Sequence, residues 1–242
     1  MEIPNSTISD SEPVLRPGER IDDLCRDGYR IIQDPSKFCF GVDAVFLTDF
    51  VRDVSEEARV LDMGTGTGVI PILLCAKKKG GSFVGLELQE FSADMAERSV
   101  RMNGLERNIE IVRGDIKEAS VLFGPGSFDA VVTNPPYMKQ NGAILNRDGE
   151  KAIARHEIMC TLEDVVREAS FVLKDRGRFF MIHRPNRLTE ILECMARYDM
   201  EAQRIQMVHP YEDKNANMVM VEGKKGCRAF LKVEPPLVLY KH

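Results

Sequence analysis

The residues best suited to chemistry are Asn134-Pro135-Pro136-Tyr137, which directly follow the apolar run 128–133. Such a run predicts a buried strand, and two prolines end it because neither can donate a hydrogen bond to a ladder. Asn134 and a proline carbonyl can accept the two hydrogens of a planar NH2 group, and Tyr137 can stack on its face. Taken alone, the same four residues also fit a turn that packs a tyrosine.

Three earlier strand ends carry groups that suit a nucleoside. The predicted strand 59–63 leads into Gly64-Thr65-Gly66-Thr67-Gly68 and then into a predicted helix. A glycine-rich turn of this kind brings backbone N–H groups close to a ligand. Glu87 ends the next predicted strand, where a carboxylate can hold both hydroxyls of a ribose. Asp115 follows the third strand and could reach the edge of an adenine.

Predicted strands and helices alternate along most of the chain. Further strands are expected at 128–133 and 178–183, and the last segments, 202–208, 218–221 and 230–233, are also strand-like. This alternation predicts right-handed crossovers and an open sheet. We expect an α/β, Rossmann-like fold with a seven-stranded, mostly parallel sheet and a C-terminal antiparallel strand.

The first 41 residues differ from the rest of the chain. Two β-like runs flank Asp27-Gly28, a short hairpin signal, and a helical pattern starts at Val42. We therefore divide the chain into an N-terminal extension with a β-hairpin (1–41) and a catalytic domain (42–242). Asp43, near the start of that helix, is either a capping carboxylate or a residue close to the cofactor.

Composition narrows the class of protein. The 242 residues carry a formal net charge of −5, so no global basic field indicates a nucleic-acid partner, and any such surface must be local. The six cysteines form no C-x-x-C pair and fit reduced thiols, so no metal site is expected. No apolar run approaches the length of a membrane span, and the acidic N-terminus lacks an apolar leader segment. We expect a cytoplasmic protein without a membrane partner.

The segment from about 59 to 137 resembles the class I S-adenosylmethionine-dependent methyltransferases. A dinucleotide site prefers G-x-G-x-x-G or A, whereas counting from Gly64 puts Val69 at the last position. The resemblance implies a class I methyltransferase fold, S-adenosyl-L-methionine as cofactor and S-adenosyl-L-homocysteine as product. The cofactor-binding positions that it implies are Asp62, Gly64, Gly66, Gly68, Glu87, Leu88, Asp115, Ile116 and Asn134.

The resemblance also implies which part of the cofactor each of these residues contacts. Asp62 would lie near its amino-acid moiety, with the glycines beneath it, Glu87 on the ribose and Asp115 on the adenine. For Asp62 there is one structural alternative, in which the glycine-loop amides simply satisfy a carboxylate at a strand end.

Within this family, Asn-Pro-Pro-Tyr resembles the motif of enzymes that methylate a planar nitrogen: adenine N6, cytosine N4 or a glutamine amide. Such a nitrogen is a poor nucleophile because its lone pair is delocalised. Accepting its hydrogens at Asn134 and at the Pro135 carbonyl would favour the pyramidal, positively charged transition state. Tyr137 would fix the plane of the substrate, so Asn134, Pro135 and Tyr137 are the expected catalytic residues.

The whole chain resembles the bacterial tRNA1(Val) (adenine-37-N6)-methyltransferase family. The flanks that carry this resemblance include 27–33, 40–47, Ala154-Arg155-His156-Glu157, 208–210 and 235–237. It implies adenine-N6 methylation of RNA, with tRNA as partner, and an unstacked loop adenine suits such a site. Arg155 and His156, with Tyr137, are expected to contact substrate, although 154–157 also fits a solvated lead-in to a helix.

Three alternatives to tRNA methylation stay open. A protein glutamine N5-methyltransferase of the release-factor type uses the same motif, but those enzymes carry a helical N-terminal domain that residues 1–41 do not resemble. A DNA adenine or cytosine amino-methyltransferase would also use it. A non-catalytic RNA-binding module with a retained cofactor fold would bind the cofactor without turnover.

Overall fold

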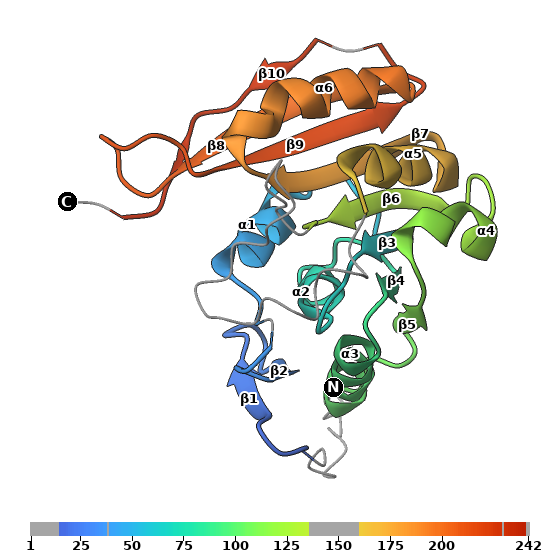
Figure 1. Cartoon of the computed structure of the whole chain (residues 1–242), viewed down its shortest axis with the longest axis vertical. Helices are drawn as coiled ribbons and strands as arrows, with labels where there is room; N and C mark the ends of the chain where they lie inside the picture. Colours follow the sequence, from blue (N-terminus) through green and yellow to red (C-terminus); the bar gives the residue numbers. More distant parts are fainter. Residues whose placement is uncertain (1–14, 38, 136–159, 229, 241–242) are drawn as a thin grey trace, which may run out of the picture.

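The computed structural model describes residues 15–37, 39–135, 160–228 and 230–240. A single large sheet runs through it, with strands in the order β10-β8-β9-β7-β6-β3-β4-β5 and with β11 on β8 (Figure 1). The strands are β3 (Arg59–Met63), β4 (Ser82–Glu87), β5 (Ile109–Arg113), β6 (Phe128–Thr133), β7 (Leu173–His183), β8 (Met200–His209), β9 (Met218–Lys225), β10 (Lys232–Val233) and β11 (Leu237–Val238).

The pairing confirms the predicted sheet and adds two short strands to it. β3, β4, β5, β6 and β7 pair in parallel, and β9 runs antiparallel to both of its neighbours, β7 and β8. These are the seven expected strands. β10 and β11 are two-residue strands that pair with β8. The strand predicted at 230–233 is therefore too long: Phe230 is fully exposed and only Lys232–Val233 pair.

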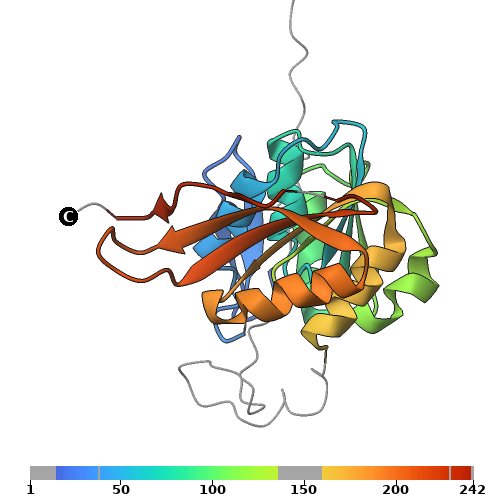
Figure 2. The ribbon, with the colours of Figure 1, turned by 90° about the horizontal axis from the view of Figure 1, so that it is seen from above.

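Helices cover both faces of the sheet, as crossovers in a parallel sheet require (Figure 2). One face carries α1 (Val42–Phe50), α2 (Val69–Ala76) and α3 (Glu90–Met102), and the other carries α4 (Ala119–Phe123), α5 (Leu162–Val172) and α6 (Leu188–Arg197). Strand alternation divides the core accordingly. On β6, Val132 packs in the first cluster and Val131 in the second.

Local sequence signals explain individual element ends. Thr161 opens α5 with a capping box, in which its hydroxyl accepts from the Asp164 N–H at 3.1 Å and the Asp164 carboxylate accepts from the Thr161 N–H at 3.0 Å. Asp27 and Gly28 both have positive φ in the turn between β1 (Arg20–Asp23) and β2 (Arg30–Gln33). The turn confirms the hairpin signal at Asp27-Gly28, and Thr161-Leu-Glu-Asp164 is the sequence pattern of a capping box.

The N-terminal hairpin packs against α3. The Ile32 N–H donates to the Ser99 hydroxyl and the Arg30 N–H to the Asn103 side-chain oxygen, each at 2.9 Å. Ile31 and Ile32 are fully buried, and Ile31 belongs to the same cluster as α1 and α2. The hairpin thus shares the core of the sheet, and the domain boundary at residue 41 stays a prediction.

Across the described ranges, no helix has the length and apolar content that crossing a bilayer requires.

Candidate active site

The predicted site residues of the first four parallel strands lie at one edge of the sheet, which we call the carboxyl edge because β3, β4, β5, β6 and β7 all end there. Asp62 on β3 is in register with Gly85 on β4 and with Val132 on β6. Neighbouring strands are about 4.8 Å apart. Ligands of open α/β sheets bind beyond such strand ends, at the point where the strand order reverses. Here that point is β3, because β4 and β5 lie on one side of it and β6 and β7 on the other.

The glycine loop after β3 requires glycine at three positions. Gly64, Gly66 and Gly68 have φ of +78°, +57° and +86°, values that side chains rarely allow. At Gly68 a Cβ would also come within 3.2 Å of the Ala96 Cβ, so this glycine lets α3 approach. At Gly66 a Cβ would meet nothing within 4 Å, which leaves the loop surface open to a ligand.

Glu87 braces this loop from the end of β4. Its carboxylate accepts from the Gly66 N–H at 2.8 Å and from the Gln89 N–H at 2.9 Å. Burial raises the pKa of Glu87, and these backbone donors offset part of the rise. A carboxylate has about four acceptor positions, so two hydroxyl groups can still donate to it. The geometry is compatible with the ribose-binding role, which stays a prediction.

Asp62 is the most unusual carboxylate of the edge. It is 2% exposed, and neither of its oxygens has a hydrogen-bond partner among the residues that the structure describes. Burial raises its pKa to about 7, and the nearby Thr65 hydroxyl offsets part of this rise although it falls short of hydrogen-bond geometry. A buried carboxylate without donors is costly unless a ligand supplies them.

The glycine-loop amides do not satisfy Asp62, so the structural alternative for this residue is wrong. The Gly64 and Thr65 N–H groups donate to the Leu86 carbonyl at 2.9 and 3.0 Å. The Gly66 N–H donates to Glu87 instead. The orphaned carboxylate therefore fits a ligand that carries an ammonium group, as the amino-acid moiety of S-adenosyl-L-methionine does.

Two apolar side chains accompany the carboxylates. The Ile116 Cδ1 atom lies 3.6 Å from the position that a Cβ on Gly64 would take, so Ile116 covers the start of the loop. Leu88, directly after Glu87, is 39% exposed. The Asp115 carboxylate caps the short helix η1 (Ile116–Glu118), where it accepts from the Lys117 N–H at 2.9 Å. Apolar walls with one polar group at the rim suit a flat purine.

The acceptor half of the site is described only in part. Asn134 and Pro135 follow β6 at the carboxyl edge, Asn134 half-buried and Pro135 buried. The Thr133 hydroxyl donates to the Met63 carbonyl at 2.9 Å and thereby ties the ends of β6 and β3 together. Tyr137, Arg155 and His156 lie outside the described residues, so their roles stay predictions.

Sequence reasoning missed His183, which ends β7. Met181 pairs with Thr133, which places His183 level with Pro135 on the neighbouring strand. His183 is 4% exposed, and burial and the Arg187 charge lower its pKa to about 4. Its Nδ1 atom accepts from the Arg184 N–H at 2.7 Å, so the neutral ring carries its proton on Nε2. The sequence signal that could have indicated it is the position of a histidine at the end of a predicted parallel strand.

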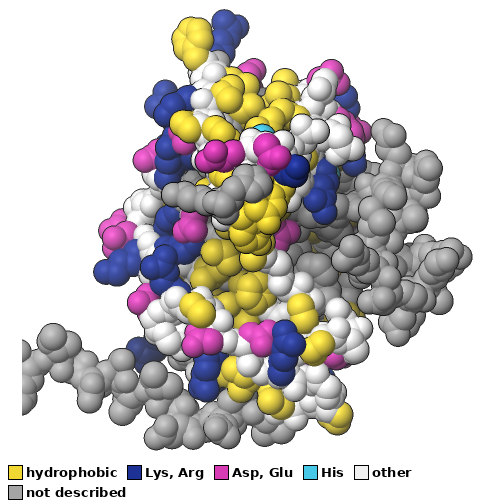
Figure 3. Space-filling view, turned by 90° about the vertical axis from the view of Figure 1, so that its left-hand side faces the viewer, with side chains coloured by type: hydrophobic (Ala, Val, Ile, Leu, Met, Phe, Trp, Pro, Cys, Tyr) yellow, Lys and Arg dark blue, Asp and Glu magenta, His cyan; other side chains and the backbone are white. Residues whose placement is uncertain are grey.

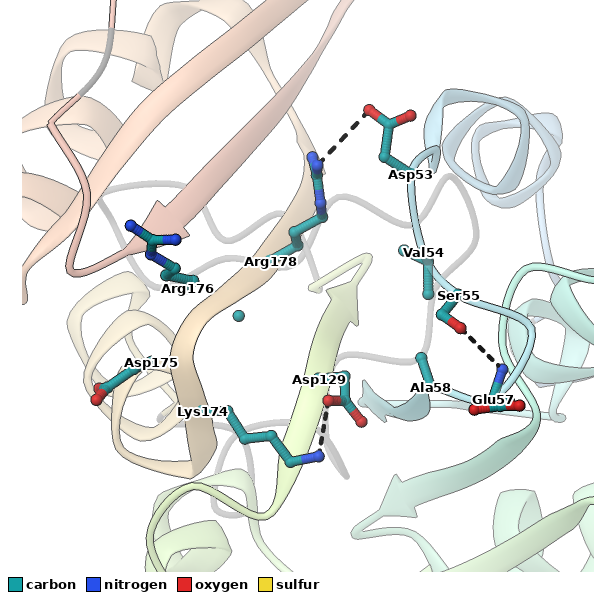
Figure 4. A pocket seen from close by; sticks show the side chains of 11 residues that line it. Asp53, Val54, Ser55, Glu57, Ala58, Asp129, Lys174, Asp175, Arg176 and Arg178 are labelled. Carbon is teal, nitrogen blue, oxygen red and sulfur yellow. Dashed lines mark hydrogen bonds and ion pairs between the residues drawn. The ribbon is translucent and has the colours of Figure 1, made fainter.

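A pocket of about 460 Å³ lies at the opposite, amino edge of the sheet, between the starts of β3 and β6 and the first half of β7 (Figure 4). Lys174 pairs with Asp129 there at 2.7 Å, and Arg178 pairs with Asp53 at 3.6 Å. Four of the charged side chains that line it are thus paired with one another. It is therefore not a candidate for the cofactor, whose expected residues are all at the carboxyl edge.

Relatives with similar sequences include methyltransferases. A tRNA1(Val) (adenine(37)-N6)-methyltransferase of Porphyromonas gingivalis is 30% identical over 166 residues, 68% of this chain and 64% of the relative. The protein of the same name from Bacteroides thetaiotaomicron is 27% identical over 73% of this chain and 72% of the relative. A release factor glutamine methyltransferase of Agrobacterium fabrum is 30% identical over 51% of this chain and 42% of the relative. The match thus spans less than two thirds of the Porphyromonas protein.

Solved structures agree on the fold. A protein of Agrobacterium tumefaciens described as a predicted O-methyltransferase superposes with a TM-score of 0.66 at 25% identity, over 82% of this chain and 88% of that one. Geranyl diphosphate C-methyltransferase of Streptomyces coelicolor, solved with S-adenosyl-L-homocysteine, gives 0.55 at 16% identity, over 76% and 78%. Residues 30–198 match the methyltransferase small domain, and because this match spans more than half of the sequence, the chain belongs to that family.

Proposed function

We propose that the chain is an S-adenosyl-L-methionine-dependent N-methyltransferase that acts on the exocyclic N6 of adenine in RNA, with tRNA as the substrate. The observation that carries the cofactor half is the buried, unpartnered carboxylate of Asp62 beside an open glycine loop. The acceptor half is supported by Asn134-Pro135 at the same edge and by the tRNA adenine-N6 methyltransferases among the relatives. A tRNA substrate would place the protein in the cytoplasm.

The cofactor-binding residues would each contact a different part of S-adenosyl-L-methionine. The Asp62 carboxylate would accept hydrogens from the ammonium group of the ligand, which would relieve its unmet hydrogen-bonding capacity. Glu87 would take the ribose hydroxyls while it holds the Gly66 amide, and Leu88 and Ile116 would flank the adenine. When bound, S-adenosyl-L-methionine supplies an electrophilic methyl group.

The substrate residues act on the amino group. Asn134 and the Pro135 carbonyl would accept its two hydrogens, an interaction that strengthens as the nitrogen becomes pyramidal and positive. Tyr137 would stack on the extruded base. No strong base is required before the attack, because the proton becomes acidic only after the nitrogen is alkylated. Asn134 therefore positions and stabilises rather than removes a proton.

A radiolabelled-methyl assay that offers unmodified tRNA, duplex DNA and a release-factor peptide side by side tests the proposal. We expect label in tRNA, at adenine N6 after digestion to nucleosides. Label confined to the peptide would instead favour glutamine methylation, which the Agrobacterium fabrum relative keeps as a second candidate. Label confined to DNA would reject RNA as the substrate class.

The matched variants are Asn134→Ala and Asn108→Ala. Asn134→Ala should lower kcat by at least about 10²-fold, the scale for losing one donor or acceptor that stabilises a transition state, with cofactor binding nearly unchanged. Asn108 is an exposed amide before β5, so its variant should retain activity. If Asn134→Ala loses cofactor binding and turnover together, Asn134 has a structural role.

A further inference from the structure

A pair of tyrosines, Tyr211 partly buried and Tyr240 exposed, lies beyond the end of β8, in a part of the chain to which the proposed chemistry assigns no role. The Tyr211 and Tyr240 ring centroids are 5.4 Å apart, with their planes inclined at 41°. Tyr240 is 56% exposed although it is a large aromatic residue. The face of the molecule toward which the C-terminal segment and α1 lie shows hydrophobic side chains gathered across its middle, with charged side chains around them (Figure 3).

Backbone hydrogen bonds, rather than side-chain packing alone, hold this pair in place. β11 pairs in parallel with the end of β8, Leu237 opposite Val208. Beyond that pairing, the Leu239 N–H donates to the His209 carbonyl and the Tyr240 N–H to the Pro210 carbonyl, each at 3.0 Å. The C-terminal segment thus places Tyr240 beside Tyr211, and the exposed ring is presented from a fixed backbone.

The tyrosine pair shares the carboxyl edge with Asn134. β9 is antiparallel to both β7 and β8, so β8 runs in the direction of β6 and β7 and ends at the same edge. From β6 to β8 the order is β6-β7-β9-β8, which is three strand spacings, or about 14 Å across the sheet. The register places Asn134 level with Gln206, so Tyr211 is also five residues, or up to about 17 Å, further along the direction of β8. Several nucleotides of single-stranded RNA span the combined distance.

The charges around the pair favour stacking over simple attraction of phosphate. The Arg184 guanidinium donates to the Asn217 carbonyl at 3.1 Å at the base of the β8–β9 loop. Lys214 in that loop pairs with Asp213 at 2.9 Å, and Glu212 is also exposed there. The local field is therefore close to balanced. What this surface offers a nucleic acid is mainly an aromatic face, which binds unpaired bases of any sequence.

We infer that Tyr211 and Tyr240 form a stacking platform for an unpaired base of the RNA substrate that flanks the target adenine. This inference rests on the proposed methylation of RNA. Extruding an adenine into the site unstacks its neighbours, and the platform would replace the lost base stacking with an aromatic face. It would thereby select RNA with an open loop over duplex nucleic acid.

Binding of a fluorescently labelled anticodon stem-loop, measured by anisotropy, tests the platform. Tyr240→Leu keeps an apolar contact with Tyr211 but removes the aromatic face, and should weaken RNA binding by about fivefold or more. Tyr240→Phe keeps the ring and should bind like the unchanged protein. Phe230→Ala is the matched control, because Phe230 is fully exposed in the same C-terminal segment but precedes β10, toward the amino edge.

Kinetics separate positioning from folding. Tyr240→Leu should raise KM for RNA while kcat at saturating RNA and the affinity for S-adenosyl-L-methionine stay within about twofold. The slope of log affinity against log salt should not change, because no phosphate contact is lost. A merely structural tyrosine would instead change thermal stability and cofactor affinity together with RNA binding.

The outcomes distinguish this inference from the function on which it rests. If the unchanged protein methylates RNA and Tyr240→Leu binds RNA equally well, the platform is wrong and the function stands. If Tyr240→Phe is as weak as Tyr240→Leu, the hydroxyl rather than the ring makes the contact, and stacking is rejected. If the unchanged protein methylates no RNA, the proposed function fails whatever the tyrosine variants do.

Discussion

Two regions of the sheet differ in how their buried charges are matched. In the antiparallel half, formed by β7, β9 and β8, the Glu222 carboxylate accepts hydrogen bonds from Arg178 and from Arg204, and the Arg204–Glu222 contact is 2.8 Å between side chains that are 4% and 3% exposed. Arg204 also donates to the Phe50 carbonyl at 2.7 Å. At the carboxyl edge, Asp62 is equally buried and has no partner in the described part of the chain.

This difference distinguishes charged groups that stabilise the fold from a charged group that is available to bind a ligand. A buried carboxylate with two guanidinium partners is matched, so removing it exposes the other charges to an apolar environment. A buried carboxylate without donors destabilises the folded state unless it is protonated or a ligand supplies donors. Variants of the antiparallel half should therefore change stability, and variants of the carboxyl edge should change ligand binding.

The largest effect on stability is expected from Glu222→Gln. The substitution removes the nearest counter-charge of the buried Arg204 and of Arg178, which leaves only the more distant Glu234 and Asp53 carboxylates at 3.9 and 3.6 Å, and it should lower the free energy of unfolding by about 3–5 kcal/mol. Urea denaturation measures this loss. Glu201→Gln is the matched control on β8, because Glu201 is exposed, and it should change stability by less than about 0.5 kcal/mol.

Cofactor affinity completes that test. The folded Glu222→Gln protein should bind S-adenosyl-L-methionine as the unchanged protein does, measured by calorimetry below the unfolding transition. A stability loss below about 1 kcal/mol, or a large loss of affinity in the folded protein, would contradict the division between the antiparallel half and the carboxyl edge.

Asp62→Asn should have the opposite profile. The substitution removes the charge that would hold the ligand's ammonium group, and affinity for S-adenosyl-L-methionine should fall about 100-fold, or about 2.7 kcal/mol. The free energy of unfolding at pH 8 should rise, because a costly buried charge has been removed. Asp53→Asn is the control at the amino edge, where Asp53 is an exposed partner of Arg178. Unchanged affinity in Asp62→Asn would remove Asp62 from the site.

Much of the site could be predicted because its residues follow strand ends. Parallel pairing brings the ends of β3, β4, β5 and β6 to one edge whatever the rest of the chain does, so Asp62, Glu87 and Asn134 could be grouped from spacing. The capping box of Thr161 can be predicted for a different reason, because its partner Asp164 is only three residues away in the sequence. Strand ends and helix caps can be predicted because they depend on local or periodic patterns in the sequence.

What could not be predicted depends on contacts between distant segments. That Glu87, and not Asp62, takes the Gly66 amide follows from the three-dimensional path of the loop. The pairing of Tyr240 with Tyr211 depends on how the C-terminal segment docks on β8. The strand at 230–233 was overestimated because β propensity does not report whether a partner strand is available.

Two glycines allow a smaller and closely matched test of the carboxyl edge. Gly66 and Gly104 have φ of +57° and +67°, and at neither would a Cβ meet an atom within 4 Å. Alanine at either position should cost about 1–2 kcal/mol of stability through the same backbone strain. Only Gly66→Ala should also weaken S-adenosyl-L-methionine binding, because its Cβ would occupy the open surface of the loop. Equal affinity in both variants would mean that no ligand approaches Gly66 closely.

The smallest expected effect is the pH dependence that two carboxyl-edge groups contribute in the intact protein. The pKa of Asp62 is raised to about 7, so its contribution to stability is present below its usual pKa of about 4 and is lost as the pH rises toward 7. The pKa of His183 is lowered to about 4, so its contribution is lost as the pH falls from about 6.5 toward 4. Between about pH 4.5 and 6.5 the two slopes oppose each other and nearly cancel.

Single variants should reveal the two opposing slopes of the free energy of unfolding against pH. Relative to the unchanged protein, Asp62→Asn should gain about 1.4 kcal/mol of stability per pH unit as the pH rises through this window, and His183→Asn should lose the same amount per unit. Urea denaturation at pH 4.5, 5.5 and 6.5 measures both. Glu87, whose pKa is also raised by burial, is present in all three proteins, and because its charge raises the pKa of Asp62, its own titration is left unchanged only in His183→Asn. Parallel curves for all three proteins would mean that neither group is held away from its ordinary pKa, and the contrast between the antiparallel half and the carboxyl edge would lose its electrostatic basis.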